Sequence, residues 1–203
     1  MTELTSLCVF CGAKPGNNPA LADAARTLGT AIGQSGRTLV FGGGRVGLMG
    51  ELARATRDAG GHVAGFIPEH LERAERADKT LPELHVVSDM HTRKLGMFER
   101  ADAFCILPGG LGTLDETFEI LTWRQLGLHD KPIALLNVEG FWDPLLEVID
   151  RIIVEGFYHT AHQHRLFTVV TDPEAVLPTL AAELAGQSPD AAPAPGHDAR
   201  ALG

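Results

Sequence analysis

Short, uninterrupted apolar segments alternate with longer amphipathic segments along most of this chain. The apolar segments are rich in Val, Ile, Leu and Phe, and we expect strands at Leu4–Phe10, Thr38–Phe41, His62–Ile67, Leu84–Val87, Ala103–Leu107, Ile133–Leu136 and Leu166–Val170. The amphipathic segments predict helices at Pro19–Gln34, Val46–Ala59, Met90–Ala101, Thr113–Leu126, Pro144–Val154 and Glu174–Leu184. Strands without a polar face are typical of a parallel sheet that helices cover on both sides. We therefore predict an α/β fold with a Rossmann-like, doubly wound parallel sheet of about seven strands.

The chain has 203 residues, which suits one domain with one sizeable core. We expect residues 1–186 to form this domain and residues 187–203, rich in Ala, Pro and Gly, to form a flexible tail.

The formal net charge of -9 argues against a nucleic-acid partner, because phosphate backbones are bound by clustered Lys and Arg. No apolar run reaches the roughly 18 to 20 residues of a membrane span. The stretch MTELTSL does not have the pattern of a signal peptide, so we expect a cytoplasmic protein.

Two groups of residues superficially suggest a metal site. Cys8 and Cys11 form C-x-x-C, but no second pair completes a zinc site, and we expect both to be buried as small apolar residues. Three histidines lie close together in YHTAHQH, at His159, His162 and His164, without a nearby acidic or cysteine partner. We expect a surface loop there and no metal.

The first of two glycine-rich loops is VFGGGRVGLMG, residues 40–50. Its Gly42-x-Gly44-x-x-Gly47 spacing matches the dinucleotide fingerprint, and Glu69 lies at about the distance of a ribose-binding acid. Either the loop binds a ligand or it is a tight turn between a strand and a helix. The lysine of a P-loop is absent, so ATP hydrolysis of that kind is not expected.

The second loop, LPGGLGTLDETFE at residues 107–119, also lies between a strand and a helix. Both loops are expected at the carboxyl edge of the sheet, where open α/β folds bind ligands, and two such loops favour a phosphorylated ligand between them. Thr113 and Glu116 have the spacing of a capping box, Thr113 as N-cap and Glu116 at N3. Glu116 can equally be a reactive carboxylate that shares a helix face with Glu119. Spacing alone leaves both interpretations open.

Two cations begin the helix that follows the fourth strand. Arg93 and Lys94 lie in the first turns of DMHTRKLGMFER, where the helix dipole opposes positive charge. We therefore expect a phosphate or a carboxylate beside them.

Four separated stretches together have a recognisable pattern: FGGGRVGLMG (41–50), MHTRK (90–94), PGGLGTLDE (108–116) and TWRQLGLHDKPIALLN (122–137). They resemble the LOG (Lonely Guy) family of cytokinin riboside 5'-monophosphate phosphoribohydrolases, whose members are often mislabelled lysine decarboxylases. The family signature P-G-G-x-G-T-x-x-E is complete, and the resemblance extends from about Cys8 to Leu180.

The resemblance implies hydrolysis of the N-glycosidic bond of cytokinin riboside 5'-monophosphates, and of AMP, to a free base and ribose 5-phosphate. It implies that Arg93 and Glu116 are catalytic, and that the protein is a homodimer. It places Gly110, Gly112 and Thr113 at the 5'-phosphate. The implied substrate-binding positions are Gly43, Gly44, Glu75, Met90, Lys94, Gly109, Gly110, Leu111, Gly112, Thr113, Leu114, Asp115 and Thr122.

The chain departs from the family pattern at a few positions. Ala13 replaces a serine in F-C-G-S-x-x-G, Leu111 stands where an aromatic is usual, and Asp115 replaces a glutamate. Glu75 matches a family glutamate, but its surroundings differ. These departures leave the catalytic pair intact and affect the choice of base.

Three other functions fit the sequence less well: a carrier, an oxidoreductase and a decarboxylase. A nucleotide or molybdenum-cofactor carrier can use similar glycine loops, but it does not need the pair of Arg93 and Glu116. A dinucleotide-dependent oxidoreductase would need a second, substrate-binding domain. None of the four lysines lies in a context typical of a pyridoxal phosphate Schiff base, so we expect neither a decarboxylase nor a cofactor.

Overall fold

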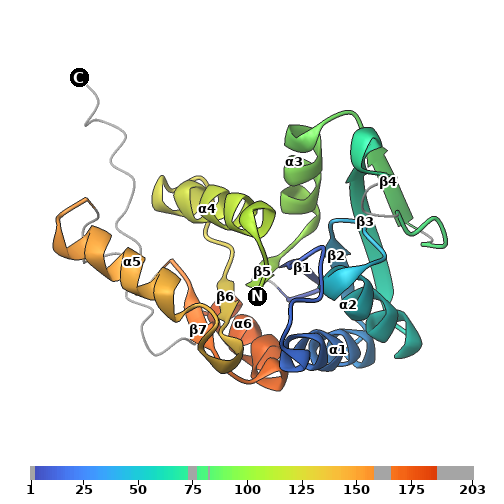
Figure 1. Ribbon diagram of the computed structural model, residues 1–203, viewed down its shortest axis with the longest axis horizontal. Helices are drawn as coiled ribbons and strands as arrows, with labels where there is room; N and C mark the ends of the chain where they lie inside the picture. Colours follow the sequence, from blue (N-terminus) through green and yellow to red (C-terminus); the bar gives the residue numbers. More distant parts are fainter. Residues whose placement is uncertain (1–2, 73–76, 82, 158–165, 187–203) are drawn as a thin grey trace.

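The computed structural model describes residues 3–72, 77–81, 83–157 and 166–186 (Figure 1). Several positions named above lie outside the described residues: Glu75, the histidines His159, His162 and His164, and residues 187–203. Among the described residues, no helix is both long and apolar enough to cross a membrane. The cytoplasmic location stays a prediction.

The described residues form one parallel sheet of seven strands, as predicted. The strands are β1 Ser6–Phe10, β2 Thr38–Phe41, β3 His62–Pro68, β4 Glu83–Val87, β5 Ala103–Ile106, β6 Ile133–Leu136 and β7 Thr168–Val170. Their order across the sheet is β4-β3-β2-β1-β5-β6-β7, and every neighbouring pair is parallel. The chain therefore builds outward from β1 to one edge, then returns to β5 and builds toward the other edge. This is the doubly wound topology that the alternating segments predict.

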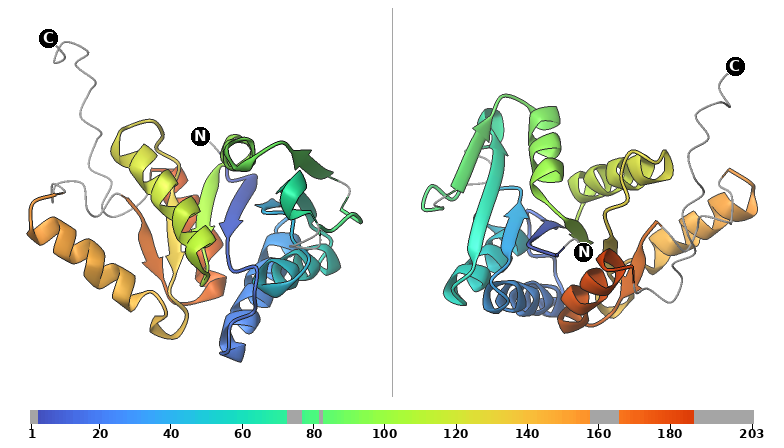
Figure 2. Two further views of the ribbon diagram at one scale, coloured as in Figure 1. Left: turned by 45° about the horizontal axis from the view of Figure 1, so that its top comes forward. Right: turned by 180° about the vertical axis from the view of Figure 1, so that it is seen from behind.

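Six α-helices connect the strands: α1 Pro19–Gln34, α2 Gly47–Asp58, α3 Met90–Arg100, α4 Leu111–Gln125, α5 Asp143–Val154 and α6 Val176–Leu184. Each lies within two residues of the helix expected from the sequence. Short 3-10 turns precede α5 and α6, at Val138–Gly140 and Pro173–Ala175, and another follows β3 at Glu69–Leu71. Helices α1, α2 and α6 lie on one side of the sheet, and α3 and α4 lie on the other (Figures 1 and 2).

Residues of each strand alternate between two hydrophobic cores. In β1, Leu7 and Val9 belong to the core beneath α1, α2 and α6, whereas Cys8 and Phe10 belong to the core beneath α3 and α4. This period of two follows from the pleat of a strand, and burial on both faces explains why the strands read as unbroken apolar runs. The cysteines Cys8, Cys11 and Cys105 are buried, and burial raises the pKa of the Cys8 thiol. They are core residues, as predicted, and no metal-binding group occurs in the part of the chain that the structure describes.

The outer strand β4 is tied to its neighbours by Glu83. The Glu83 carboxylate lies 2.7 Å from His62 Nε2 on β3 and 3.2 Å from His85 Nε2, and it accepts a 3.3 Å hydrogen bond from Arg100 Nε on α3. Partial burial raises the pKa of Glu83, but the hydrogen bonds to His62, His85 and Arg100 outweigh it and lower the pKa from 4.5 to about 2. Ionised Glu83 therefore stabilises this edge of the sheet.

The loops after β1 and β5 meet at the carboxyl edge of the sheet, where these two strands lie side by side. Phe10 at the end of β1 pairs with Ile106 at the end of β5. The backbone N–H of Gly12, just after β1, donates to the carbonyl of Pro108, just after β5, over 3.0 Å. The winding of the sheet reverses between these strands, which is where doubly wound folds leave a ligand crevice.

Candidate active site

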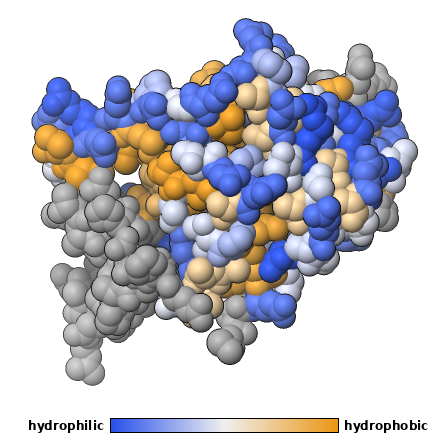
Figure 3. All heavy atoms as spheres, turned by 90° about the horizontal axis from the view of Figure 1, so that it is seen from below, coloured by the Kyte–Doolittle hydropathy of each residue, from blue (hydrophilic) through white to orange (hydrophobic). Residues whose placement is uncertain are grey.

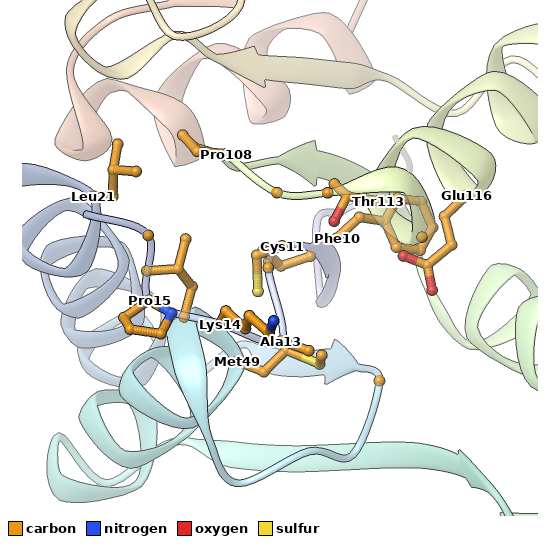
Figure 4. A pocket seen from close by; sticks show the side chains of 18 of the residues that line it. Phe10, Cys11, Ala13, Lys14, Pro15, Leu21, Met49, Pro108, Thr113 and Glu116 are labelled. Carbon is orange, nitrogen blue, oxygen red and sulfur yellow. The ribbon is translucent and has the colours of Figure 1, made fainter. Parts of the chain in front are cut away.

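A cavity of about 450 Å³ opens at the carboxyl ends of β1, β2 and β5 (Figure 4). Its described lining consists of Val9, Phe10, Cys11, Gly12, Ala13, Lys14, Pro15, Gly16, Leu21, Gly42, Leu48, Met49, Arg93, Pro108, Gly109, Gly110, Gly112, Thr113, Glu116 and Phe141. Figure 4 shows Thr113 and Glu116 of α4 at one end, with Pro15 and Leu21 at the other. The cavity thus has a polar end and a largely apolar end.

The second glycine loop presents the open start of α4 to this cavity. Gly110 is the N-cap, with φ -100° and ψ -157°, and no side chain caps the helix. Among the described residues, no hydrogen bond uses the backbone N–H groups of Leu111, Gly112 or Thr113. These are the donors that an α-helix leaves unpaired at its start, and the helix dipole adds positive potential there. The start of α4 is therefore well suited to an anion.

The capping-box interpretation of Thr113 and Glu116 is wrong. Helix α4 begins three residues earlier than that interpretation requires, at Leu111 after the Gly110 cap. Thr113 is therefore at N3, and Glu116 is nearly a turn further along the helix. The Glu116 side chain lines the cavity instead of returning to the Thr113 backbone. A glycine N-cap leaves the donors of the first turn free, whereas a threonine cap would have occupied one of them.

The first glycine loop supports the wall of the cavity. The Gly12 carbonyl accepts hydrogen bonds from the Leu48 and Met49 N–H groups, over 3.0 and 3.4 Å, so these donors at the start of α2 are already paired. A Cβ at Gly47 would overlap the Ala13 carbonyl and lie 2.5 Å from Lys14 N. Glycine is therefore required there for close packing of the two loops. The start of α2 does not offer the free N–H groups that the dinucleotide fingerprint needs.

Gly43 and Gly44, predicted to bind substrate, are buried behind the cavity lining. The Gly43 carbonyl accepts a 3.1 Å hydrogen bond from the Asp78 N–H, and Gly44 forms an isolated bridge with Ala77. Glu69, considered as a ribose-binding acid, is exposed after β3 and outside the lining. Within residues 40–50, Gly42, Leu48 and Met49 line the cavity.

Arg93 and Glu116 meet at the polar end of the cavity, as the family resemblance implies. Both are buried, with 4% and 8% of their surface exposed, and Arg93 Nη1 lies 3.9 Å from Glu116 Oε1. Two backbone carbonyls hold the guanidinium: Nε donates to Phe66 O over 3.1 Å, and Nη2 donates to Gly42 O over 3.0 Å. These carbonyls belong to β3 and to the loop after β2. Arg93 is thereby fixed by the sheet edge, with one nitrogen directed at Glu116.

Lys94 joins α3 to α4 outside the cavity. Its Nζ lies 3.1 Å from Asp115 Oδ2 and 3.0 Å from Glu119 Oε1. Burial lowers the pKa of Lys94, but the carboxylates of Glu119 and Asp115 outweigh it and raise the pKa above its ordinary value. The expectation of a carboxylate or phosphate beside each of the two cations is confirmed. Arg93 lies beside Glu116, and Lys94 lies beside Asp115 and Glu119. Glu116 and Glu119, predicted to share a helix face, both point toward α3.

The predicted substrate-binding residues thus fall into two groups. The structure brings Gly109, Gly110, Gly112 and Thr113 to the cavity with Arg93 and Glu116. The remaining described positions lie outside the cavity lining of this chain: Gly43, Gly44, Met90, Lys94, Leu111, Leu114, Asp115 and Thr122. Met90 stays near the site, because its sulfur lies 3.7 Å from Arg93 Nη1. Leu111, at 86% exposed, points to solvent.

The loop after β1, residues 11–16, is a cavity wall that was not assigned to the site from the sequence. Cys11, Gly12, Ala13, Lys14, Pro15 and Gly16 all line the cavity, and Phe141 joins them after β6. A signal was present, because this loop also follows a strand and contains two glycines. It shares the carboxyl edge of the sheet with the other two loops.

The fold and this cavity define the class of the protein: a Rossmann-like α/β protein with a ligand cavity at the switch point of a parallel sheet. A family profile described as "Possible lysine decarboxylase" matches residues 49–180. LOG1 of Arabidopsis thaliana, named a cytokinin riboside 5'-monophosphate phosphoribohydrolase, is 45% identical over 175 residues, or 86% of this chain and 82% of that protein. LOG of Oryza sativa subsp. japonica has the same activity in its name and is 45% identical over 171 residues, or 84% of this chain and 71% of that protein. The chain belongs to the LOG family.

Solved structures share the fold at lower identity. The molybdenum cofactor carrier protein from Chlamydomonas reinhardtii superimposes with a TM-score of 0.68 at 19% identity, covering 91% of this chain and 99% of that one. The molybdenum cofactor binding protein from Rippkaea orientalis has a TM-score of 0.67 at 20% identity, with the same coverage. At these identities the likeness shows the fold alone.

Proposed function

We propose that this protein hydrolyses the N-glycosidic bond of cytokinin riboside 5'-monophosphates, and of AMP, to the free base and ribose 5-phosphate. One observation carries the proposal: the buried pair of Arg93 and Glu116 shares a cavity with the open start of α4. Family membership supports it, because relatives at about 45% identity are named for this activity.

The 5'-phosphate is assigned to the start of α4. The N–H groups of Gly112 and Thr113 lie in the first turn of α4, where the helix dipole favours an anion. The Thr113 hydroxyl has no hydrogen-bond partner among the described residues and belongs to a residue of the cavity lining. With the phosphate here, the ribose extends along α4 toward Glu116, nearly one turn further on.

Glu116 is assigned the main catalytic role. As the bond between C1' of the ribose and the base nitrogen breaks, the electron pair leaves with the base, and positive charge develops on the sugar. A buried carboxylate stabilises that charge and accepts a proton from the water that attacks C1'. Glu116 then passes this proton to the base nitrogen that carries the electron pair, and the water oxygen becomes the C1' hydroxyl.

Arg93 is assigned to position Glu116. Its guanidinium is fixed by Phe66 O and Gly42 O, and the 3.9 Å approach of Nη1 keeps the Glu116 carboxylate on the cavity side of α4. The Arg93 guanidinium also offsets the negative charge of the Glu116 carboxylate in this buried pair.

A pair of matched substitutions tests the catalytic role. We expect Glu116→Gln to reduce base release from AMP and from isopentenyladenosine monophosphate by about 10²–10⁴-fold, the usual contribution of a general base. Glu119→Gln is the control, because Glu119 lies on the same face of α4 but pairs with Lys94. Chromatography of the released base measures both. A Glu116→Gln variant with near wild-type rates would remove Glu116 from the mechanism.

A cofactor carrier is the second candidate. The resemblance to molybdenum cofactor proteins concerns the fold, and a carrier has no use for a buried Arg93–Glu116 pair. A panel of nucleoside monophosphates separates the two functions. We expect free base to appear with at least one of them, whereas a carrier would bind ligand without releasing base.

We also propose that the protein is a homodimer. Large apolar side chains are exposed along the outer side of α4 and just beyond it, at Leu111, Phe118, Leu126 and Leu128. A second apolar surface lies at the end of the molecule formed by α5, where Val148, Ile152 and Val154 are exposed (Figure 3). Exposed apolar patches of this kind typically mark protein interfaces.

We assign the dimer contact to the α4 surface, because it continues from Leu111 directly into the cavity wall at Gly110 and Gly112. Sedimentation velocity of Phe118→Asp and Val148→Asp distinguishes the surfaces. We expect Phe118→Asp to give monomers and Val148→Asp to leave the dimer intact. The reverse result would move the interface to α5.

A further inference from the structure

Lys14 is a cation in the cavity wall that no step above uses. It belongs to the loop after β1, directly after Ala13, and both residues line the cavity (Figure 4). No ion pair or side-chain hydrogen bond among the described residues involves the Lys14 ammonium group. The other described lysines each have such a partner: Lys79 pairs with Glu72, Lys94 with Asp115 and Glu119, and Lys131 donates to Phe98 O.

The backbone of Lys14 is held firmly in this position. The preceding Gly12 carbonyl accepts from two N–H groups of α2, and the Gly12 N–H donates to Pro108 O. Gly47 packs against the Ala13–Lys14 peptide so closely that a Cβ there would lie 2.5 Å from Lys14 N. Pro15 restricts the backbone of Lys14 further. The side chain therefore starts from a fixed point on the cavity wall.

Lys14 decides the balance of charged side chains in the cavity lining. Among the described lining residues, the side chains with a formal charge are those of Lys14, Arg93 and Glu116. Arg93 lies beside Glu116, and their charges offset each other. The whole chain carries a net charge of -9, so a doubly charged phosphate depends on local cations to enter.

The loop that carries Lys14 is joined to the loop that begins α4. The hydrogen bond from Gly12 N to Pro108 O links them, and a Cβ at Gly12 would lie 3.5 Å from Gly109 Cα. Lys14 and the start of α4 therefore form adjoining walls of one cavity. An anion at the start of α4 would have helix N–H groups on one side and a mobile ammonium group on the other.

We infer that Lys14 binds the substrate's 5'-phosphate together with the start of α4, and that it selects phosphorylated ligands over unphosphorylated nucleosides. The inference rests on the proposed function for the identity of the ligand. The side chain contributes an ionic contact, and the N–H groups of Gly112 and Thr113 contribute directional hydrogen bonds. Lys14 is a binding residue and has no part in the breaking of the glycosidic bond.

Binding of ribose 5-phosphate to the full chain tests this without turnover. We expect Lys14→Ala to weaken calorimetric binding of ribose 5-phosphate by about five- to tenfold, as for a partly exposed charged hydrogen bond. Lys14→Arg retains the cation and should remain within about twofold of wild type. Lys79→Ala is the control, since Lys79 is an exposed lysine that pairs with Glu72 and is not part of the lining, and it should bind as wild type. The salt dependence of binding should be weaker in Lys14→Ala.

Two results would overturn the inference. One is a Lys14→Ala variant that binds ribose 5-phosphate as tightly as wild type. The other is equal weakening of ribose 5-phosphate and of adenosine, which would indicate a general disturbance of the cavity. Failure of the proposed function is a separate result: wild-type protein that binds ribose 5-phosphate but releases no base from any nucleotide. In that case the effect of Lys14→Ala on phosphate binding still decides the inference.

Discussion

Gly42→Ala is a substitution whose effect follows directly from the geometry of Arg93. A methyl group at Gly42 would overlap Arg93 Nη2, lie 3.1 Å from Arg93 Cζ and lie 3.0 Å from Met49 Sδ. Arg93 is 4% exposed, so its guanidinium has little room to move aside. The hydrogen bond from Nη2 to the Gly42 carbonyl must break, and Nη1 must move relative to Glu116.

The size of the effect can be worked out from these contacts. A hydrogen bond to a charged group contributes about 1.5–3 kcal/mol. If that amount is lost from the positioning of Glu116 in the transition state, kcat/KM falls by about 10–100-fold. Overpacking a buried site also lowers the free energy of unfolding by about 1–3 kcal/mol. Ribose 5-phosphate binding should change little, because the start of α4 and Lys14 are untouched.

Base release from AMP, calorimetric binding of ribose 5-phosphate and thermal unfolding together test this expectation. Gly29→Ala is a matched control, because a Cβ at Gly29 would lie 2.5 Å from Leu52 O between α1 and α2, far from Arg93. It should lower the unfolding temperature and leave kcat/KM of the folded protein unchanged. A folded Gly42→Ala protein with wild-type kcat/KM would refute the view that the Gly42 carbonyl fixes the catalytic arginine.

Further predictions concern the phosphate end, the edge strand and the cofactor. Gly109→Ala would place a methyl group on the Thr113 hydroxyl, so calorimetry should show weaker binding of ribose 5-phosphate, and unchanged affinity would contradict the assigned role of Thr113. The folded pKa of Glu83, about 2, lies below its ordinary value of 4.5, so its stabilising contribution is complete above pH 4.5 and is lost as the pH falls toward 2. Chemical denaturation should show a smaller loss of stability in acid for Glu83→Gln, and an identical profile would exclude this contribution. Purified protein should show no pyridoxal absorbance band, and a band that survives dialysis would reopen the decarboxylase assignment.

The strands of the sheet can be predicted from the pattern of apolar residues along the chain. The strands around β1 read as unbroken apolar runs because both faces of the sheet are covered, and all seven were found within two residues of their predicted ends. The boundary that mattered most was the start of α4. Thr113 is an attractive N-cap by residue type, but Gly110 occupies that position, and glycine is also a favourable N-cap residue.

The residues of the candidate site were predicted unevenly. The signature around Thr113 and Glu116 points to the start of α4, and the family resemblance alone names Arg93 and Glu116 as the catalytic pair. The spacing of Gly42, Gly44 and Gly47 does not reveal that the Gly12 carbonyl of another loop already pairs two N–H donors at the start of α2. Lys14 was overlooked for the same reason: its place depends on Gly12, Gly47 and their contacts across the sheet edge.

The sequence by itself determined the class of fold, the family and the two residues at the centre of the proposed chemistry, because burial periodicity and short signatures are local properties of the chain. The tertiary structure decided which way Glu116 points and, within the described part of the chain, which glycine loop has unpaired N–H groups and which lysine lacks a partner. Those properties depend on groups far apart in the chain, such as the Gly12 carbonyl on α2 and the Phe66 and Gly42 carbonyls on Arg93. Hydrogen-bond donors are available to a ligand only where no such distant group has already paired them.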